Sequence, residues 1–337
     1  MKNVLITGGA GFIGANFVEY LLRREDFMHV IVLDKLTYAG STKNLKEVWH
    51  HPRYTFIQGD ISDATLLKNI FDKYVITDIF HFAAESHVDN SIVGPEPFIQ
   101  SNIIGTFRLL EQCRKSWLMS ANTLREKYKN ARFLHVSTDE VYGSLGKKGL
   151  FKESTPYAPN SPYSASKAAS DFLVRSYFHT YGLPVLTTNC SNNYGPYQHR
   201  EKLIPTIIRK ALSGEAIPIY GTGENVRDWL YVTDHCEGIL KVWKKGKLGE
   251  TFNIGGDNEK TNLEIANIVC EVLDKKQPKN TSFKKQISFV EDRLGHDYRY
   301  AIDAEKIKST LGWEAKESFI TGIEKTIEWY LDNKDRL

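Results

Sequence analysis

Residues 4–14 read VLITGGAGFIG, an apolar run followed by glycines spaced as Gly8, Gly11 and Gly14. A strand that turns through such glycines into a helix is the fingerprint of a dinucleotide-binding βα unit. The first glycine permits the tight turn, the second lets the backbone approach a pyrophosphate, and the third lets helix pack closely on strand. The helix N-terminus then points unpaired N–H groups at the phosphates. This stretch therefore predicts the first unit of a parallel α/β sheet.

The alternation of strand and helix continues along the chain. Apolar runs of strand length occur at residues 4–7, 30–33, 54–58, 79–82, 133–137 and 185–189. Residues 165–181 are predicted to form a long helix. Such alternation indicates an α/β fold, with a Rossmann-type doubly wound parallel sheet and right-handed crossovers.

This pattern weakens near residue 190, where Pro196 and Pro205 mark shorter elements and loops. We therefore expect residues 1–190 to form a dinucleotide-binding domain. Residues 191–337 are expected mainly to form a smaller C-terminal domain that binds the substrate. Segments near residues 229–254 are predicted to return to the first domain, so the two domains would not be joined by a single clean linker.

The composition is that of an ordinary soluble globular protein, with 41% hydrophobic and 25% charged residues. A net charge of +3, without long like-charged runs, gives no reason to expect nucleic acid as a partner. The four cysteines form no CxxC pair, so neither a metal site nor a disulfide framework is predicted. No apolar run reaches the ~18 residues that a membrane helix needs. We expect a cytoplasmic protein that binds no membrane and no metal.

A carboxylate in the second βα unit indicates which dinucleotide the protein binds. Asp34 ends the second predicted strand, twenty residues beyond Gly14, where it can accept hydrogen bonds from both ribose hydroxyls. It would repel a 2′-phosphate, so NAD is favoured over NADP. Asp60 ends the third strand, where it could bind the adenine amino group or, equally well, cap the following helix. Ala83 and Ala84 follow the fourth strand and leave room for a cofactor to pass.

A tyrosine and a lysine stand four residues apart, at Tyr163 and Lys167, on one face of the long predicted helix. An ammonium beside a phenol favours the phenolate and should lower its pKa, which is normally ~10. The pair could then take a proton from a substrate hydroxyl while hydride leaves for the nicotinamide. By itself this spacing is weak evidence, but after a dinucleotide fingerprint it indicates a redox active site.

The glycine turn and the Tyr163–Lys167 pair together resemble the extended short-chain dehydrogenase/reductase family, whose members mostly act on nucleotide sugars. In that family Ser137 and Thr138 would complete the Ser/Thr-Tyr-Lys triad, with Thr138 hydrogen-bonding the sugar's 4-oxygen. More specifically, residues 135–143 (HVSTDEVYG) resemble the signature of the dTDP-glucose 4,6-dehydratases within this family. Further segments that match it in order are residues 83–89, 191–196, 201–205, 227–229 and 292–300. The stretch 143–163 is shorter than the family pattern.

Adjacent carboxyl groups, Asp139 and Glu140, distinguish the chain from an epimerase. They follow Thr138 at the carboxyl end of a predicted strand, the edge where open α/β sheets bind ligands, although polar loop residues could also stand there. Once C4 of a sugar is oxidised to a ketone, its C5 proton becomes acidic, and water can leave across C5 and C6. That elimination needs a base and an acid, which two close carboxyl groups can supply if their pKa values are pushed apart.

The resemblance implies an NAD-dependent lyase that converts dTDP-glucose to dTDP-4-keto-6-deoxyglucose and water, with Asp139 as acid and Glu140 as base. The implied catalytic residues are Thr138, Asp139, Glu140, Tyr163 and Lys167. Those implied to bind NAD are Gly8, Gly11, Phe12, Ile13, Gly14, Asp34, Lys35, Leu36, Thr37, Asp60, Ile61, Ala83, Ala84, Ser86, Ser101, Tyr163, Lys167 and Asn193. Those implied to bind the nucleotide sugar are Ser86, Thr138, Asn192, Lys202, Leu203, Pro218, Tyr220, Arg227, Asn262, Arg293 and His296.

The residues leave some alternatives open. The substrate could be a UDP-, CDP- or GDP-linked sugar, and a 4-epimerase on the same fold is a more distant possibility. A silent NAD-binding regulator would not need the five implied catalytic residues. Resemblance also implies a homodimer formed by helices near residues 102–114 and 164–181, whose apolar side chains Ile103, Phe107, Leu110 and Phe172 could equally be core.

Overall fold

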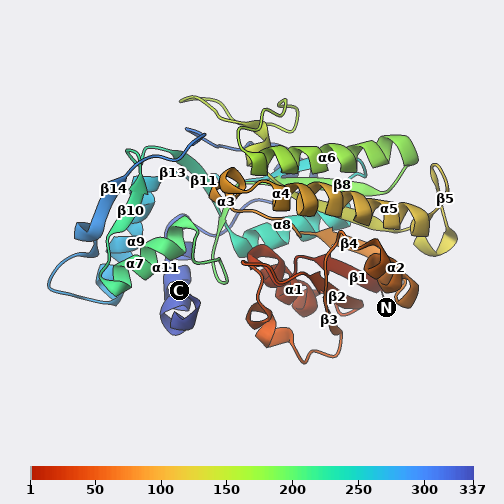
Figure 1. The fold of residues 1–337 in the computed structure, drawn as a ribbon, viewed down its shortest axis with the longest axis horizontal. Coiled ribbons are helices and arrows are strands. Elements are labelled where there is room, and N and C mark those ends of the chain that lie inside the picture. The colour runs from red at the N-terminus through yellow and green to blue at the C-terminus, as the bar shows by residue number, and fades with distance from the viewer. Residues whose placement is uncertain (1) are drawn as a thin grey trace.

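Seven parallel strands form the central sheet, in the order β12-β8-β7-β4-β1-β2-β3 (Figure 1). They are β1 (Lys2–Thr7), β2 (Met28–Asp34), β3 (Tyr54–Gln58), β4 (Ile76–His81), β7 (Arg132–Thr138), β8 (Val185–Cys190) and β12 (Thr251–Ile254). The computed structural model describes residues 2–337, so Met1 lies outside the described residues. The predicted fold class, a Rossmann-type doubly wound sheet, is confirmed.

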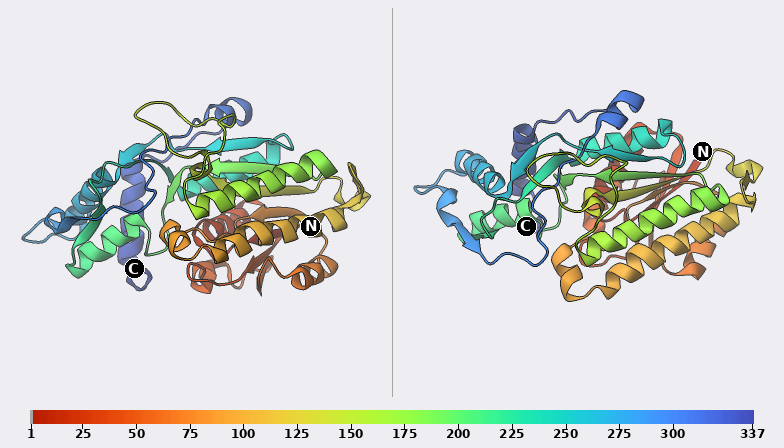
Figure 2. Two further views of the ribbon diagram at one scale, coloured as in Figure 1. Left: turned by 45° about the horizontal axis from the view of Figure 1, so that its top comes forward. Right: turned by 90° about the horizontal axis from the view of Figure 1, so that it is seen from above.

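Helices cover both faces of this sheet and enclose two apolar cores (Figures 1 and 2). One face packs against α1 (Phe12–Arg24) and α8 (Val232–Lys245). The other packs against α2 (Ala64–Lys73), α5 (Thr106–Trp117) and α6 (Pro162–Tyr181). In this arrangement the carboxyl ends of all seven strands meet at one edge, where open α/β sheets bind ligands.

Strand β4 and helix α6 begin earlier than predicted, in both cases because of polar residues. Strand β4 begins at Ile76 rather than at residue 79, because Asp78 lies in its buried middle and interrupts the apolar run. Trp243 donates a hydrogen bond to this carboxylate over 2.9 Å, and Lys2 pairs with it at 3.2 Å. Helix α6 begins at Pro162 rather than at residue 165, because Ser161 caps it in a capping box with Ser164.

The rest of the chain builds a smaller unit around a third apolar core. Its helices are α7 (Leu203–Ser213), α9 (Asn262–Lys276) and α11 (Phe319–Asp332). Its strands pair as β10 (Ile217–Tyr220) with β14 (Ile287–Val290), and as β13 (Glu259–Thr261), β11 (Val226–Tyr231) and β9 (Asn192–Tyr194). Between β11 and the smaller unit's later elements, the chain passes through α8 and β12 in the larger layer. A domain boundary near residue 190 stays a prediction.

Short elements complete the fold. They are α3 (Val88–Val93), α4 (Glu96–Phe98), α10 (Glu305–Leu311), β5 (Leu118–Ser120), β6 (Thr123–Leu124), the π-helix η2 (Ile99–Gly105) and the 3-10 helices η1 (Thr42–Val48), η3 (Glu126–Tyr128), η4 (Asp139–Tyr142), η5 (Phe283–Gln286) and η6 (Lys334–Arg336).

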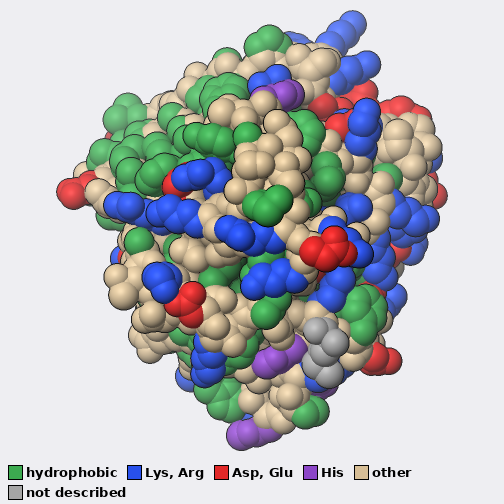
Figure 3. All heavy atoms as spheres, turned by 90° about the vertical axis from the view of Figure 1, so that its right-hand side faces the viewer, with side chains coloured by type: hydrophobic (Ala, Val, Ile, Leu, Met, Phe, Trp, Pro, Cys, Tyr) green, Lys and Arg blue, Asp and Glu red, His purple; other side chains and the backbone are tan. Residues whose placement is uncertain are grey.

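On the face shown in Figure 3, lysine and arginine side chains stand among hydrophobic, polar and acidic ones. Within residues 2–337, no helix has both the length and the apolar character needed to cross a membrane.

Candidate active site

A cavity of about 280 Å³ opens at the carboxyl ends of the central strands. The glycine turn, the ends of β2, β7 and β8, the loop that follows β4, and the start of α6 line it. Every residue predicted to bind the cofactor lies on its wall except Leu36. Leu36 lies beside the cavity with φ of 58° and donates its N–H to Asp34 Oδ1 at 2.8 Å.

The glycine turn fits a pyrophosphate. A Cβ atom on Gly14 would stand 2.2 Å from the carbonyl oxygen of Gly8, and Gly8 itself has φ of 70°, so neither position accommodates a side chain without strain. Helix α1 begins after Gly11, and none of the side chains in residues 2–337 caps its first turn. Its first N–H groups are therefore left for an anion.

Two carboxylates stand where a ribose and an adenine are expected. Asp34 is buried at the end of β2 and accepts the N–H of Ala10 through Oδ2 at 2.8 Å. Burial raises the pKa of Asp34, and the two backbone hydrogen bonds to it act in the opposite direction. Asp60 pairs with Lys35 at 2.7 Å, whereas Asp63 caps α2. The alternative reading of Asp60 as a helix cap is therefore wrong.

The five predicted catalytic residues meet in the same cavity, although they come from three elements. Thr138 ends β7, Asp139 and Glu140 form η4, and Tyr163 and Lys167 lie one turn apart on α6. Tyr163 and Lys167 are both buried, and the Lys167 ammonium donates to the carbonyl oxygen of Val136 at 2.9 Å.

The expected lowering of the Tyr163 pKa by Lys167 is wrong for this structure. Burial raises the pKa of Tyr163 well above its ordinary value, and the neighbouring Glu140 acts in the same direction. Burial also lowers the pKa of Lys167, whose ammonium is turned to Val136. A positive charge on the buried Lys167, one turn away on α6, would favour the phenolate.

The environments of the two adjacent carboxyl groups differ as acid–base chemistry requires. Burial raises the pKa of Asp139 well above its ordinary value, and Glu140 and then Asp228 add to the effect. Burial also raises the pKa of Glu140, but Arg293, Lys202 and Arg227 oppose that rise with their positive charges. Asp139 is accordingly the member of the pair that more readily holds a proton, and Glu140 is the one that more readily ionises.

A second cavity, of about 220 Å³, adjoins the first and shares Glu140, Asn192, Glu201 and Lys202 with it. Its wall contains seven further residues predicted to bind the nucleotide sugar: Leu203, Pro218, Tyr220, Arg227, Asn262, Arg293 and His296. The remaining two, Ser86 and Thr138, line the first cavity. Three cations face this space, as a diphosphate would require.

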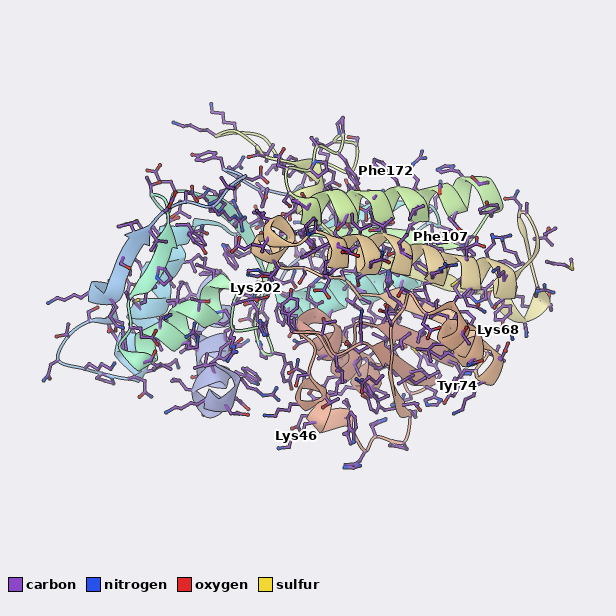
Figure 4. All side chains as sticks on the ribbon, in the orientation of Figure 1. Lys46, Lys68, Tyr74, Phe107, Phe172 and Lys202 are labelled. Carbon is purple, nitrogen blue, oxygen red and sulfur yellow. The ribbon has the colours of Figure 1, made fainter. Side chains whose placement is uncertain are left out.

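Local contacts fix the orientation of these cations. Arg227 stacks on the Tyr300 ring at 4.2 Å and donates to the carbonyl oxygens of Val226 and Asp297 at 2.7 and 2.9 Å. Lys202 lies between the two units in Figure 4 and donates to Ser86 O at 3.0 Å. Helix α9 is capped by Thr261, so Asn262 does not serve as its N-cap.

Several cavity residues received no role from the sequence. Glu85, His87 and Glu201 line the cavities, and they lie inside segments that match the family without having been assigned. His235 gave no local signal, since it lies on α8, far along the chain from Asn193. Its Nδ1 nevertheless stands 2.9 Å from Asn193 Oδ1 and fixes the orientation of that amide.

Comparison with known proteins agrees with this geometry. The model of the family described as GDP-mannose 4,6 dehydratase matches residues 5–326. A dTDP-glucose 4,6-dehydratase of Xanthomonas campestris is 54% identical over 99% of this chain and 94% of its own. The dTDP-glucose 4,6-dehydratase 1 of Escherichia coli is 52% identical over 98% of this chain and 93% of its own.

Solved structures extend the likeness to three dimensions. A dTDP-glucose 4,6-dehydratase from Streptomyces venezuelae, crystallised with NAD and TYD bound, superposes with a TM-score of 0.89 at 45% identity, covering 99% of this chain and 98% of that one. A UDP-glucose 4-epimerase from Thermotoga maritima gives 0.85 at 29% identity over 98% and 99% of the two chains. The protein belongs to the family of nucleotide-sugar 4,6-dehydratases that includes the dTDP-glucose 4,6-dehydratases.

Proposed function

We propose that the protein is an NAD-dependent lyase that converts dTDP-glucose to dTDP-4-keto-6-deoxyglucose and water. The observation that carries this proposal is the adjacent pair Asp139 and Glu140. Burial raises the pKa of both carboxyl groups, and three cations oppose the rise at Glu140. Glu140 lies where the cavity with the glycine turn meets the cavity lined by cations. The relatives named dTDP-glucose 4,6-dehydratase support dTDP-glucose as the substrate.

The glycine turn, Asp34 and Asp60 would hold the cofactor along the first cavity. When bound, the cofactor would supply the redox chemistry, as a hydride acceptor for C4 of the sugar in its oxidised form and as a hydride donor for C6 in its reduced form. Because both transfers occur in one turnover, the cofactor must stay bound throughout. The buried end of β2, which lines this cavity, suits such retention.

The residues at the junction would move the protons. Tyr163 takes the proton of the C4 hydroxyl, while Thr138 hydrogen-bonds the same oxygen. Glu140 then takes the C5 proton, and Asp139 gives its proton to the C6 hydroxyl, which leaves as water. When hydride returns to C6, a proton is added back at C5. Lys202, Arg227 and Arg293 would bind the diphosphate through charge-assisted hydrogen bonds.

A substrate panel tests the activity. The purified protein should release a 4-keto sugar, detected by its absorbance in alkali, from dTDP-glucose in preference to UDP-, GDP- and CDP-glucose. A preference for glucose linked to another nucleotide would support the dehydratase activity but assign it a different substrate. Epimerisation without any keto product would contradict the elimination, and bound cofactor without turnover on any of the four sugars would indicate a regulator.

Asp34→Ala tests the cofactor site. Loss of the ribose hydrogen bonds should weaken NAD by ~1.5–3 kcal/mol and should weaken NADP less, since the alanine no longer repels a 2′-phosphate. A binding titration of both cofactors measures the difference, with Asp63→Ala as the control because Asp63 caps α2 outside the cavity. If Asp34→Ala weakens the binding of NAD and NADP equally, Asp34 does not contact the ribose hydroxyls as proposed.

We also propose that the protein is a cytoplasmic homodimer formed through α5 and α6. These helices lie side by side, and Phe172 and Phe107 are labelled on them in Figure 4. Phe172 is 58% exposed, so its ring is available for a contact between subunits. Leu110 is wrong as an interface residue, because it is buried in the core beneath α5.

Phe172→Glu should therefore convert a dimer to a monomer, measured by light scattering after gel filtration. Phe289→Glu is the matched control, since Phe289 is 59% exposed but lies on β14 in the smaller unit. A native protein that is monomeric, or a Phe172→Glu variant that stays dimeric, would exclude this interface.

A further inference from the structure

A second charged residue follows the redox pair on α6. Asp171 lies one turn beyond Lys167, and both side chains are buried against β7. The two contact neighbouring residues of that strand: Lys167 donates to Val136 O at 2.9 Å, and Ser137 Oγ donates to Asp171 Oδ2 at 2.8 Å. Asp171 is not on the wall of either cavity, so it acts on the site only through other residues.

The hydrogen bonds around Asp171 define its charge. Burial lowers the pKa of His135 well below its ordinary value, so the ring is neutral and carries one proton. Nε2 lies 3.0 Å from Asp171 Oδ1, whereas Nδ1 has no partner within residues 2–337, which assigns the proton to Nε2. The Tyr157 hydroxyl accepts from Asn189 at 3.0 Å and donates to Asp171 Oδ2 at 2.9 Å.

Asp171 therefore accepts from three donors, which is the pattern of a carboxylate. Burial raises its pKa to about 6, so it remains ionised through the alkaline range. The loop that joins η4 to α6 is tied to the same carboxylate, because Tyr157 belongs to that loop.

Other groups packed around Lys167 provide no comparable charge. His81 on β4 and His135 on β7 are neutral, because burial lowers both pKa values. Cys190 on β8 is a neutral thiol, because burial raises its pKa. On α6 itself Tyr163 is protonated, and Asp171 is the carboxylate that favours the charged form of Lys167.

We propose that Asp171 is a positioning residue whose buried carboxylate keeps Lys167 as an ammonium beside Tyr163. The inference rests on the proposed redox role of Tyr163 and Lys167. In chemical terms, the carboxylate compensates the cost of burying an ammonium, and the ammonium in turn stabilises the phenolate that forms when Tyr163 takes or returns its proton.

The test is the pH dependence of turnover in Asp171→Asn, which keeps the shape of the side chain and removes its charge. The alkaline limb of the profile should move down by at least about one pH unit, because an opposite charge nearby typically shifts a pKa by about one to three units. Tyr157→Phe is the matched control, since it removes a hydrogen bond to the same carboxylate and leaves the charge. Its alkaline limb should stay where the native limb lies.

An unmoved alkaline limb in a folded Asp171→Asn variant would overturn the inference. If that variant folds but is too unstable for a turnover profile, the same substitution is made in a Lys167→Met background, where no ammonium needs compensation. The loss of melting temperature caused by Asp171→Asn should then be smaller than in the native background, and an equal loss would show a structural role alone. Full activity of Lys167→Met would instead contradict the proposed redox pair.

Discussion

Glu140→Gln should stop water elimination while leaving both binding sites intact. Glutamine keeps the size and most of the hydrogen bonding of Glu140 but cannot take the C5 proton. Loss of a general base should lower turnover by ~10²–10⁴-fold. In D₂O the native enzyme should place deuterium at C5 and move the C4 hydrogen to C6 of the same molecule. NMR of the variant should show no exchange of the C5 hydrogen.

Cofactor content and nucleotide-sugar affinity, measured on the same Glu140→Gln preparation, control for damage to the fold. Their retention is expected because the glycine turn and the cations of the second cavity are untouched. A native product without deuterium at C5 would falsify the elimination route itself. Full activity of Glu140→Gln would leave the elimination route standing but would show that Glu140 is not its base.

Tyr163→Phe should abolish the step that precedes elimination. Without the phenol oxygen, the group proposed to take the C4 hydroxyl proton is lost, so mixing with substrate should give no transient absorbance of reduced cofactor. Asp139→Asn should keep that transient signal and slow the loss of water by ~10²–10⁴-fold, because it removes only the general acid. Stopped-flow absorbance separates the two cases.

The environment of Asp139 strengthens this contrast. Its carboxyl group is buried, its pKa is raised well above the ordinary value, and its Oδ2 finds no hydrogen-bond partner in residues 2–337. A neutral amide therefore replaces a neutral acid, and the fold should tolerate the change. Identical stopped-flow traces for Tyr163→Phe and Asp139→Asn would contradict the division of roles between the two residues.

What the sequence determined was local. The glycine turn, Asp34 at the end of its strand and the spacing of Tyr163 and Lys167 each depend on residues close in the chain. Parallel strand order then follows from βα alternation, because right-handed crossovers leave few topologies. The segments that resemble the dehydratases likewise indicated the family, which the relatives confirm.

Burial and long-range contacts decided the rest. The sequence could not tell whether Asp60 or Asp63 caps α2, nor that Leu110 belongs to the core. The resemblance predicted an acid at Asp139 and a base at Glu140, but the positive charges that oppose the rise of the Glu140 pKa come from Lys202, Arg227 and Arg293, brought from distant parts of the chain.

The redox pair shows the same limit. The spacing predicted that Lys167 would lower the pKa of Tyr163. Spacing does not report desolvation, and in the folded protein burial raises the pKa of Tyr163 and lowers that of Lys167. The role proposed for Asp171 likewise depends on the fold, because Ser137, His135 and Tyr157, which donate to it, come from other elements. Electrostatic energies depend on the distances and the dielectric of the folded chain, and only the tertiary structure fixes those two quantities.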